Sequence, residues 1–167
     1  NLNDIAKDHP DVVIETLTEW QDGSPEVAGI TRHGLRTLLK RGDADALALL
    51  GYRSNPAVRV HDLRLEPPDV AVGGWTRLHF AISSTGHEPQ RVMVDLVVHF
   101  QKAKGQLLPK VFKLKTAELA PDQTIELSRK LAFAHLSTRT IYPGPHAVEV
   151  QVNGSRLGRI DFDVAPA

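Results

Sequence analysis

Asp4 is the one carboxylate of this chain in an unusual chemical setting. It follows two amides, Asn1 and Asn3, in a short stretch with helical character, and we expect it to face the same groove as Arg32. A carboxylate beside a group of cations can stabilise positive charge that develops on a substrate. The plainer alternative is an exposed aspartate near the end of a helix.

A stripe of basic residues follows in the next expected helices. Arg32, Arg36 and Lys40 are spaced at i, i+4 and i+8, with His33 beside the first, which predicts three cations on one side of a helix. Like charges at this spacing repel, and no acidic residue lies between them, so the pattern favours a polyanionic partner over a merely solvated helix face. The opposite side is apolar and is expected to be buried: Ile30, Leu35, Leu38 and Leu39.

The second basic feature is a lysine-rich stretch. The chain has no net charge, with 20 Lys and Arg against 20 Asp and Glu, yet residues 99–115 contain five lysines and no acid. A local field of this kind attracts polyanions. The alternative is a hairpin that lysines protect against edge-to-edge aggregation. The five residues are Lys102, Lys104, Lys110, Lys113 and Lys115.

Several other kinds of chemistry are missing from the sequence. There is no cysteine, hence no disulfide and no cysteine-based zinc site, which favours a reducing, cytoplasmic location. The eight histidines are scattered without a helical ligand spacing, and no phosphate-binding glycine loop or nucleophile elbow occurs. No apolar run approaches the roughly 18 residues of a membrane helix. We therefore expect no metal, no cofactor and no membrane partner.

The period of the apolar residues changes once, near Pro56. Up to Tyr52 they recur every three or four positions, which indicates amphipathic helices. The helices are expected in the last turns before His9, from Pro10 to about Trp20, from a Ser24 cap to about Arg41, and from an Asp43 cap to Leu50. The first has no visible cap, so we read residues 1–52 as the end of a stacked helical array in the C-terminal part of a longer protein.

From Val58 to Val164 the apolar residues recur at every second position, which indicates half-buried strands. Seven short strands in about 110 residues, with an Asn153-Gly154 hairpin turn, predict an immunoglobulin-like sandwich. The expected strands are Val58–Glu66, Arg77–Ser83, Arg91–Gln101, Lys110–Thr116, Thr124–Phe133, Ala147–Val152 and Arg159–Val164.

Parts of the sequence resemble a known family. The HEAT-like-repeat alkylpurine DNA glycosylases, specifically the AlkC branch, are similar in the helical part at residues 1–11, 30–43 and 46–52. The sandwich part resembles the immunoglobulin-like domain appended in that branch at residues 98–102, 109–113, 137–139 and 142–144. The resemblance covers essentially the whole chain.

The resemblance implies an α + β multidomain fold: the end of an α-helical HEAT-like repeat array (1–52), a linker (53–57) and an all-β immunoglobulin-like sandwich (58–167). It implies a monomeric DNA repair glycosylase that removes N3-alkylated bases from duplex DNA by hydrolysis of the N-glycosidic bond, while the isolated segment is inactive. Such an enzyme acts on the bacterial nucleoid. Asp4 becomes the candidate catalytic residue.

The candidate DNA-binding residues come from both parts of the chain: Asn3, Arg32, His33, Arg36, Lys40, Lys102, Lys104, Lys110, Lys113, Arg139 and Tyr142. We expect those of the sandwich to gather at one end, the end turned towards the helical array, and to form a second contact with the duplex opposite the helices. The alternative from another class is a non-enzymatic scaffold, a helical-repeat end plus a sandwich that binds protein. The direction of the basic side chains distinguishes the two.

Overall fold

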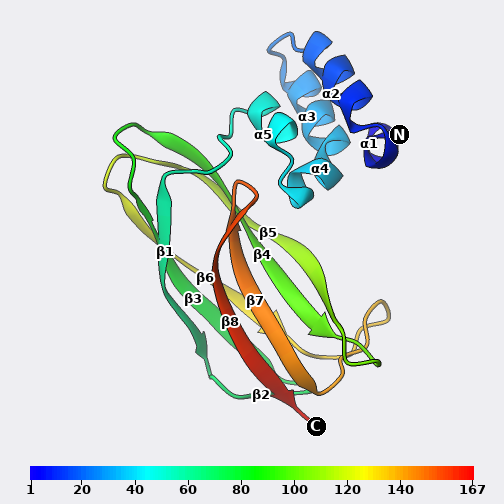
Figure 1. Cartoon of the computed structure of the whole chain (residues 1–167), viewed down its shortest axis with the longest axis vertical. Coiled ribbons are helices and arrows are strands. Elements are labelled where there is room, and N and C mark those ends of the chain that lie inside the picture. Colours follow the sequence, from blue (N-terminus) through cyan, green and yellow to red (C-terminus); the bar gives the residue numbers. More distant parts are fainter. The chain divides into compact units, whose positions relative to one another are not determined.

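A computed structural model describes residues 1–167 and resolves the chain into two compact units (Figure 1). The first, the helical unit, comprises Asn1–Pro56 with Asn153–Ser155, and the second, the sandwich unit, comprises Ala57–Val152 with Arg156–Ala167. Strands account for 46% of the residues and helices for 23%, so the chain is mostly β.

The helical unit contains five short helices: α1 (Leu2–Asp8), α2 (Pro10–Glu19), α3 (Pro25–Gly34), α4 (Arg36–Arg41) and α5 (Ala44–Leu49). Ser24 and Asp43 cap α3 and α5 as expected, each accepting a backbone N–H bond through its side-chain oxygen. The prediction that the first helix lacks a cap was wrong, because Asn1 Oδ1 accepts from the backbone N–H of Asn3 at 3.2 Å.

The single helix expected up to Arg41 is broken at Leu35, whose φ and ψ are −89° and 1°. The break has a tertiary cause. The backbone N–H of Thr37 donates to Asn3 Oδ1 at 2.9 Å, a bond from α4 to α1 in place of the next helical bond. Leu35 itself is fully buried. Arg32 therefore lies on α3, whereas Arg36 and Lys40 lie on α4.

The predicted fold class was wrong in its helical part. No helix exceeds ten residues, and residues 1–52 contain no long HEAT-like helical array. The small helical unit closes around a few buried side chains instead. Ile30, which was expected to be buried, is 47% exposed, and so is Trp20. The buried set is Ala6, Val13, Leu17, Leu35, Leu38, Leu39, Ala46 and Leu47.

The sandwich unit contains eight strands: β1 (Val58–Glu66), β2 (Val70–Ala71), β3 (Trp75–Ser84), β4 (Gln90–Gln101), β5 (Leu107–Leu119), β6 (Thr124–Ala132), β7 (Gly144–Val152) and β8 (Ser155–Ala165). The seven predicted strands are all present. The eighth strand, β2, pairs in parallel with β8. Because it is only two residues long, it has no alternating pattern from which it could be predicted.

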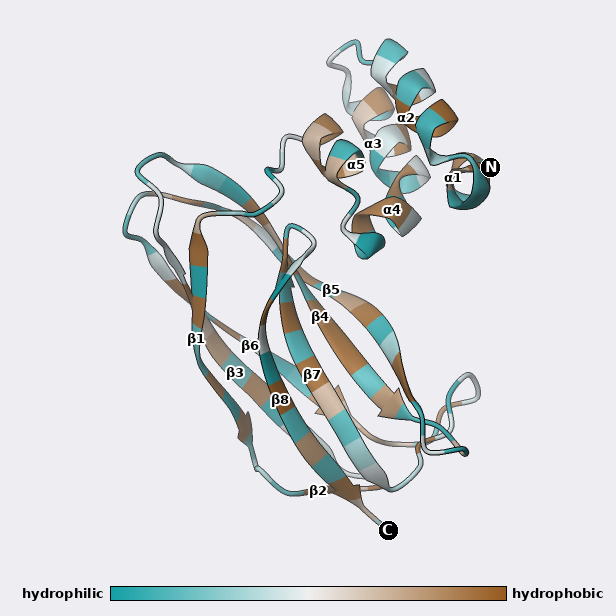
Figure 2. Cartoon of the chain, viewed as in Figure 1, coloured by the Kyte–Doolittle hydropathy of each residue, from teal (hydrophilic) through white to brown (hydrophobic).

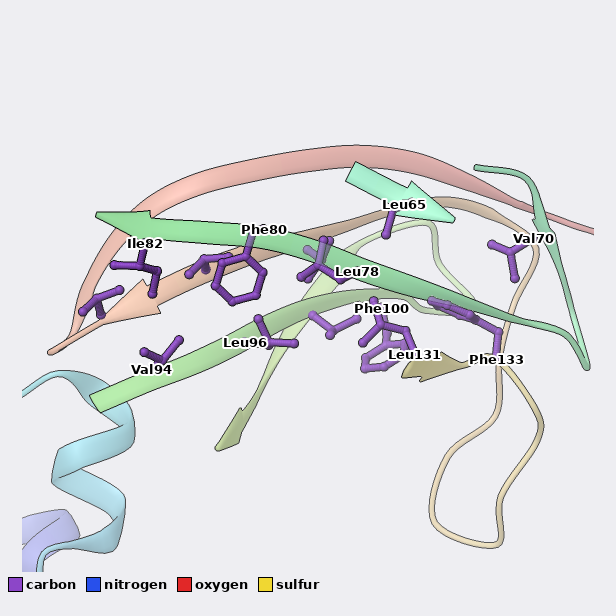
Figure 3. Packing of buried hydrophobic residues seen from close by; sticks show 14 of the residues in the cluster. Leu65, Val70, Leu78, Phe80, Ile82, Val94, Leu96, Phe100, Leu131 and Phe133 are labelled. Atoms are coloured by element: carbon purple, nitrogen blue, oxygen red, sulfur yellow. The ribbon is translucent and has the colours of Figure 1, made fainter. Parts of the chain in front are cut away.

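The strands form a three-stranded sheet, in the order β1-β3-β6, and a five-stranded sheet, in the order β2-β8-β7-β4-β5. Brown and teal segments alternate along several strands, as period-2 burial requires (Figure 2). Figure 3 shows the result: Phe80 and Ile82 of β3 point toward Leu96 and Val94 of β4, respectively, and such side chains fill the space between the sheets.

Aromatic rings dominate one region of this core. Phe133 is 1% exposed and meets the rings of Phe100, His146 and Phe162 at centroid distances of 5.5–6.2 Å. His146 is equally buried, its Nδ1 lies 2.9 Å from the carbonyl oxygen of Gly144, and its Nε2 has no hydrogen-bond partner. Burial lowers the pKa of His146 below its ordinary value, against weaker opposing effects of the Gly144 bond and the charge of Asp163.

We expect His146 to make the sandwich acid-sensitive. Because its pKa is lower in the folded than in the unfolded chain, the unfolded chain binds the proton first, and stability falls as the pH drops below about 6.5. It then levels off below the folded pKa. Urea unfolding at several pH values between 7.5 and 5 measures this loss. His146→Phe should reduce it, whereas His87→Gln, at an exposed histidine, should leave it unchanged; equal losses in all three proteins would contradict the assignment.

The sandwich has two ends. The chain enters at Val58, and the β4–β5 turn and the segment between β6 and β7 lie at the opposite end of the sheets (Figure 1). These two segments are joined there, because Gln101 Nε2 donates to the carbonyl oxygen of Pro143 at 2.6 Å and the guanidinium of Arg139 lies over the Phe100 ring. The turn that carries Lys102 and Lys104 and the segment that carries Arg139 and Tyr142 therefore lie together at the end of the sandwich opposite Val58.

Candidate nucleic-acid interface

Asp4 stands on the surface of α1 as a charged carboxylate. Its Oδ1 accepts a hydrogen bond from Lys7 Nζ at 2.8 Å, and the two side chains are 60% and 47% exposed. This hydrogen bond, followed by the charge of Lys7 and smaller contributions from the N-terminal amine and Arg36, lowers the pKa of Asp4. Asp4 is therefore ionised at neutral pH and within electrostatic reach of the first residue of α4.

Lys7 is a site residue that the motif search missed. Its i, i+3 spacing from Asp4 was visible in the sequence and is the spacing at which helical ion pairs form. An exposed pair of this kind contributes little to stability. Its effect is on the carboxylate, whose pKa it lowers and whose Oδ1 it holds at 2.8 Å.

Asn3 was predicted to touch DNA, but the structure places its side chain inside the helical unit. It is 4% exposed, and its Oδ1 accepts the Thr37 N–H bond that breaks α3 from α4. Asn3 thus fixes α1 to the start of α4, which holds its neighbour Asp4 close to Arg36. The role that this geometry supports is positioning.

The other predicted residues of the helical unit are all exposed, and we call them the helical basic patch: Arg32, His33, Arg36 and Lys40. Arg32 and His33 occupy the last turn of α3, and Lys40 the last turn of α4, where cations interact favourably with the helix dipole. The break at Leu35 means that they do not follow one continuous helical stripe. They lie on successive turns along the chain, from the end of α3 to the end of α4.

The four predicted lysines of the sandwich, which we call the hairpin basic patch, differ in setting. Lys104 is exposed at the tip of the β4–β5 turn, whereas Lys102 is half-buried and its backbone closes that turn with Gln106. The other two, Lys110 and Lys113, are exposed on β5, the edge strand of the five-stranded sheet.

The register of β5 separates its two lysines. Lys110 pairs with Val98, a core-facing residue of β4, and its Nζ lies 5.5 Å from the centroid of the Phe112 ring. Lys113 pairs with Asp95, which alternates with the core-facing residues and so belongs to the outer face. A polyanion that meets both lysines must therefore run along the edge of the sheet.

Arg139 is not the freely exposed arginine that its loop position suggested. Its guanidinium carbon lies 4.3 Å from the centroid of the Phe100 ring, Nη2 donates to the carbonyl oxygen of Ala132 at 3.4 Å, and Nε is buried without a partner. Burial lowers the pKa of Arg139. It helps to line a small cavity of about 100 Å³ with Leu96 and Phe112, and Tyr142 nearby in sequence is half-buried.

Two further features of the chain concern membranes and metal ions. None of the helices is long and apolar enough to span a membrane. No group of three or more His, Asp or Glu side chains is arranged to hold a metal ion. The groups that could act on a ligand are one ionised carboxylate, Asp4, and a set of arginines and lysines, some of which lie on the sandwich.

The fold and the charge distribution define a two-unit protein whose immunoglobulin-like sandwich carries basic side chains at one end and along one edge. Residues 59–166 match the family described as "Uncharacterised protein YhaZ, C-terminal Ig-like domain". The chain belongs to this family.

Two longer proteins are similar to nearly all of the chain. The uncharacterized protein YhaZ of Bacillus subtilis (strain 168) is 36% identical over 164 residues, which are 98% of this chain and 45% of that protein. The solved structure of the Pseudomonas fluorescens alkylpurine DNA glycosylase AlkC, bound to DNA containing an abasic site analog, is 38% identical with a TM-score of 0.94. The matched region comprises 98% of this chain but only 45% of the AlkC chain.

A more distant likeness concerns the fold alone. The β-glucosidase of Listeria innocua, in complex with gluconolactone, matches 69% of this chain with a TM-score of 0.55 and 13% identity, over 17% of its own length.

The predicted resemblance to the AlkC glycosylases is confirmed as a similarity of sequence and structure. The predicted helical-repeat array is not confirmed.

Proposed function

We propose that this chain is part of a DNA repair glycosylase and that it binds duplex DNA while the enzyme removes alkylated bases. The observation that carries the proposal is the similarity to AlkC, which extends over 98% of the chain and includes the helical unit as well as the sandwich. Similarity of this extent at 38% identity includes the segment that holds Asp4 and the helical basic patch.

The proposed substrate is an N3-alkylated base. Alkylation makes the base cationic, so its glycosidic bond is already weak, and the remaining task is to stabilise the oxocarbenium character of the sugar and to place a water molecule. An ionised carboxylate suits both tasks. Asp4 is such a group, and Asn3 and Lys7 hold it on α1 beside the start of α4.

The proposed DNA contacts are made to phosphates. Arginines and lysines on a surface without a base-reading motif bind the backbone of any sequence and release counterions as they do so. The helical basic patch and the exposed members of the hairpin basic patch fit this role. Arg139 contributes directly only if its guanidinium leaves the Phe100 ring. A protein with this role would act in the bacterial cytoplasm. We propose that it acts as a monomer.

Base release tests the proposal directly. The enzyme that contains this chain is incubated with duplex DNA carrying 3-methyladenine, and the free base is measured by chromatography. Release above that of a buffer control is expected. A protein that binds the duplex but releases no base would leave only a DNA-binding role, and one that does neither would favour the protein-binding scaffold.

The edge lysines give a sharper test of DNA binding by this chain. Replacing Lys104, Lys110 and Lys113 together by Ala should weaken binding to a labelled duplex and reduce the slope of log K against log salt by about 2 to 3, since each phosphate contact contributes about 0.9. Fluorescence anisotropy at several salt concentrations measures both quantities.

The matched control removes three exposed arginines of the three-stranded sheet: Arg59, Arg64 and Arg129. It changes the net charge by the same amount but should leave the slope within about one unit of the parent protein. Equal losses in the two triple variants would mean that net charge alone governs binding, and no loss in the lysine variant would make β5 a solvated edge.

A further inference from the structure

The outer face of the three-stranded sheet carries a cluster of polar side chains that the proposed glycosylase does not use. Arg59 of β1, Ser83 of β3 and Thr124 of β6 stand opposite one another in register, and His61, Ala81 and Glu126 form the next row. These residues alternate with the core-facing Val60 and Ile82, so they belong to the face turned away from the core.

His61 and Ser83 form a continuous hydrogen-bonded chain with Asp62, the neighbour of His61 in sequence. His61 Nδ1 lies 2.9 Å from Asp62 Oδ2, and His61 Nε2 lies 2.8 Å from Ser83 Oγ. An ionised carboxylate only accepts hydrogen bonds, so Nδ1 carries the proton, and in the neutral imidazole Nε2 is left to accept from the serine hydroxyl. Asp62, His61 and Ser83 therefore have the geometry of an orienting acid, a general base and a nucleophile.

The backbone of β1 is distorted at this point. Consecutive residues of a regular strand point to opposite faces, so Asp62 would normally turn away from His61. The register of β1 against β3 shifts between His61 and Arg64, and Asp62 has a φ of +54°, a conformation that non-glycine residues seldom adopt. Bulges of this kind re-aim side chains and recur beside active sites. Here the bulge brings the Asp62 carboxylate to the imidazole of its neighbour.

The surroundings of Ser83 supply two further requirements of acyl transfer. Thr124 Oγ1 lies 2.7 Å from Ser83 Oγ, and Arg59 is the cross-strand neighbour of Ser83 on the other side, so a hydroxyl and a cation flank the serine. A groove of about 350 Å³ is lined by Asp62 together with residues such as Arg64, His79 and Glu126, whereas Ser83 and His61 are not among its lining residues. It is large enough to hold a small acyl group next to the cluster.

We propose that Ser83, His61 and Asp62 form a second reactive site that cleaves small esters, independent of DNA. Ser83 Oγ attacks the carbonyl carbon while its proton passes to His61 Nε2. The alcohol then leaves with that proton as the ester bond breaks and the acyl group stays on Ser83. Water attacks the acyl-enzyme next and gives its proton to His61, which returns it to Ser83 Oγ as the carboxylic acid departs. Asp62 holds the imidazole in the required tautomer, and Arg59 and Thr124, the cross-strand neighbours of Ser83, are the groups that would stabilise the developing oxyanion.

A fluorophosphonate probe tests the site on the chain itself, because Ser83 would displace fluoride and become phosphonylated. Mass spectrometry should find one label, on Ser83, and Ser83→Ala should carry none. His61→Ala should slow labelling about 10²-fold, the usual contribution of a general base. Asp62→Asn keeps a residue that tolerates positive φ and should slow labelling at least tenfold. Hydrolysis of p-nitrophenyl acetate should follow the same order.

Ser128→Ala is the matched control, since Ser128 is an exposed serine on the same face, opposite His79. It should label like the parent chain. Circular dichroism establishes that each variant is folded. A folded parent chain that takes no label on Ser83, or a His61→Ala variant that labels at the parent rate, would reduce the cluster to surface hydrogen bonds and overturn the proposal.

Discussion

Replacing Asp4 by Asn in the enzyme that contains this chain should lower the single-turnover rate of base excision by about 10²-fold or more, the size of effect expected when one preorganised electrostatic group is removed. The substitution keeps the shape of the side chain and removes its charge. Because that charge acts mainly on the cationic transition state, the loss should appear in the rate of the chemical step.

DNA affinity should move in the opposite direction. Asp4 lies near Arg36 and pairs with Lys7, so removing its negative charge leaves both cations more available to phosphates. Binding of Asp4→Asn to a duplex with an abasic-site analog should therefore be slightly tighter. This opposite movement of rate and affinity separates a catalytic group from a group that only helps the protein to bind.

Asp8→Asn is the matched control for the Asp4 prediction. Asp8 is an exposed carboxylate at the end of the same helix, and its replacement changes the net charge by the same amount. Its excision rate should stay within about threefold of the parent, well below the 10²-fold effect. An Asp4→Asn enzyme with a normal rate and weakened binding would move Asp4 to a structural role, and equal rate losses in both variants would point to net charge.

The sandwich could be predicted well from the sequence because the signal for a strand is local. Alternation such as that of Val92, Val94 and Leu96 shows which face is buried, whatever the rest of the chain does. The exception, β2, is too short to alternate and exists through its pairing with β8.

The break between α3 and α4, the burial of Asn3 and the partial burial of Arg139 could not be predicted because the deciding contacts are distant in sequence. α3 and α4 separate because Asn3 bonds to Thr37, 34 positions away, and this same bond buries a side chain that a motif reading had assigned to DNA. Arg139 lies over Phe100 for a similar reason. The sequence shows that a residue is a cation. Whether that cation is free to bind DNA depends on the ring or carbonyl group that the fold places beside it.

Phe133→Ala should destabilise the sandwich by about 3 to 5 kcal/mol, the usual cost of a large-to-small change in a closed core. Its ring is 1% exposed and borders Phe100, His146 and Phe162, which come from three different strands. These neighbours are themselves large and held by the sheets, so they cannot collapse into the space. Urea unfolding should show a lower midpoint with an unchanged slope.

The effect should also reach the basic end of the sandwich. Phe133 is followed directly by the segment that carries Arg139, and the Phe100 ring on which Arg139 rests is one of its contacts. Loss of Phe133 should therefore loosen that segment, seen as faster amide exchange in residues 134–143, under conditions where the domain is still folded. Trp75→Ala, at an aromatic residue that is 46% exposed, is the matched control and should cost less than about 1 kcal/mol. Equal destabilisation by the two substitutions would mean that the aromatic cluster is not the centre of this core.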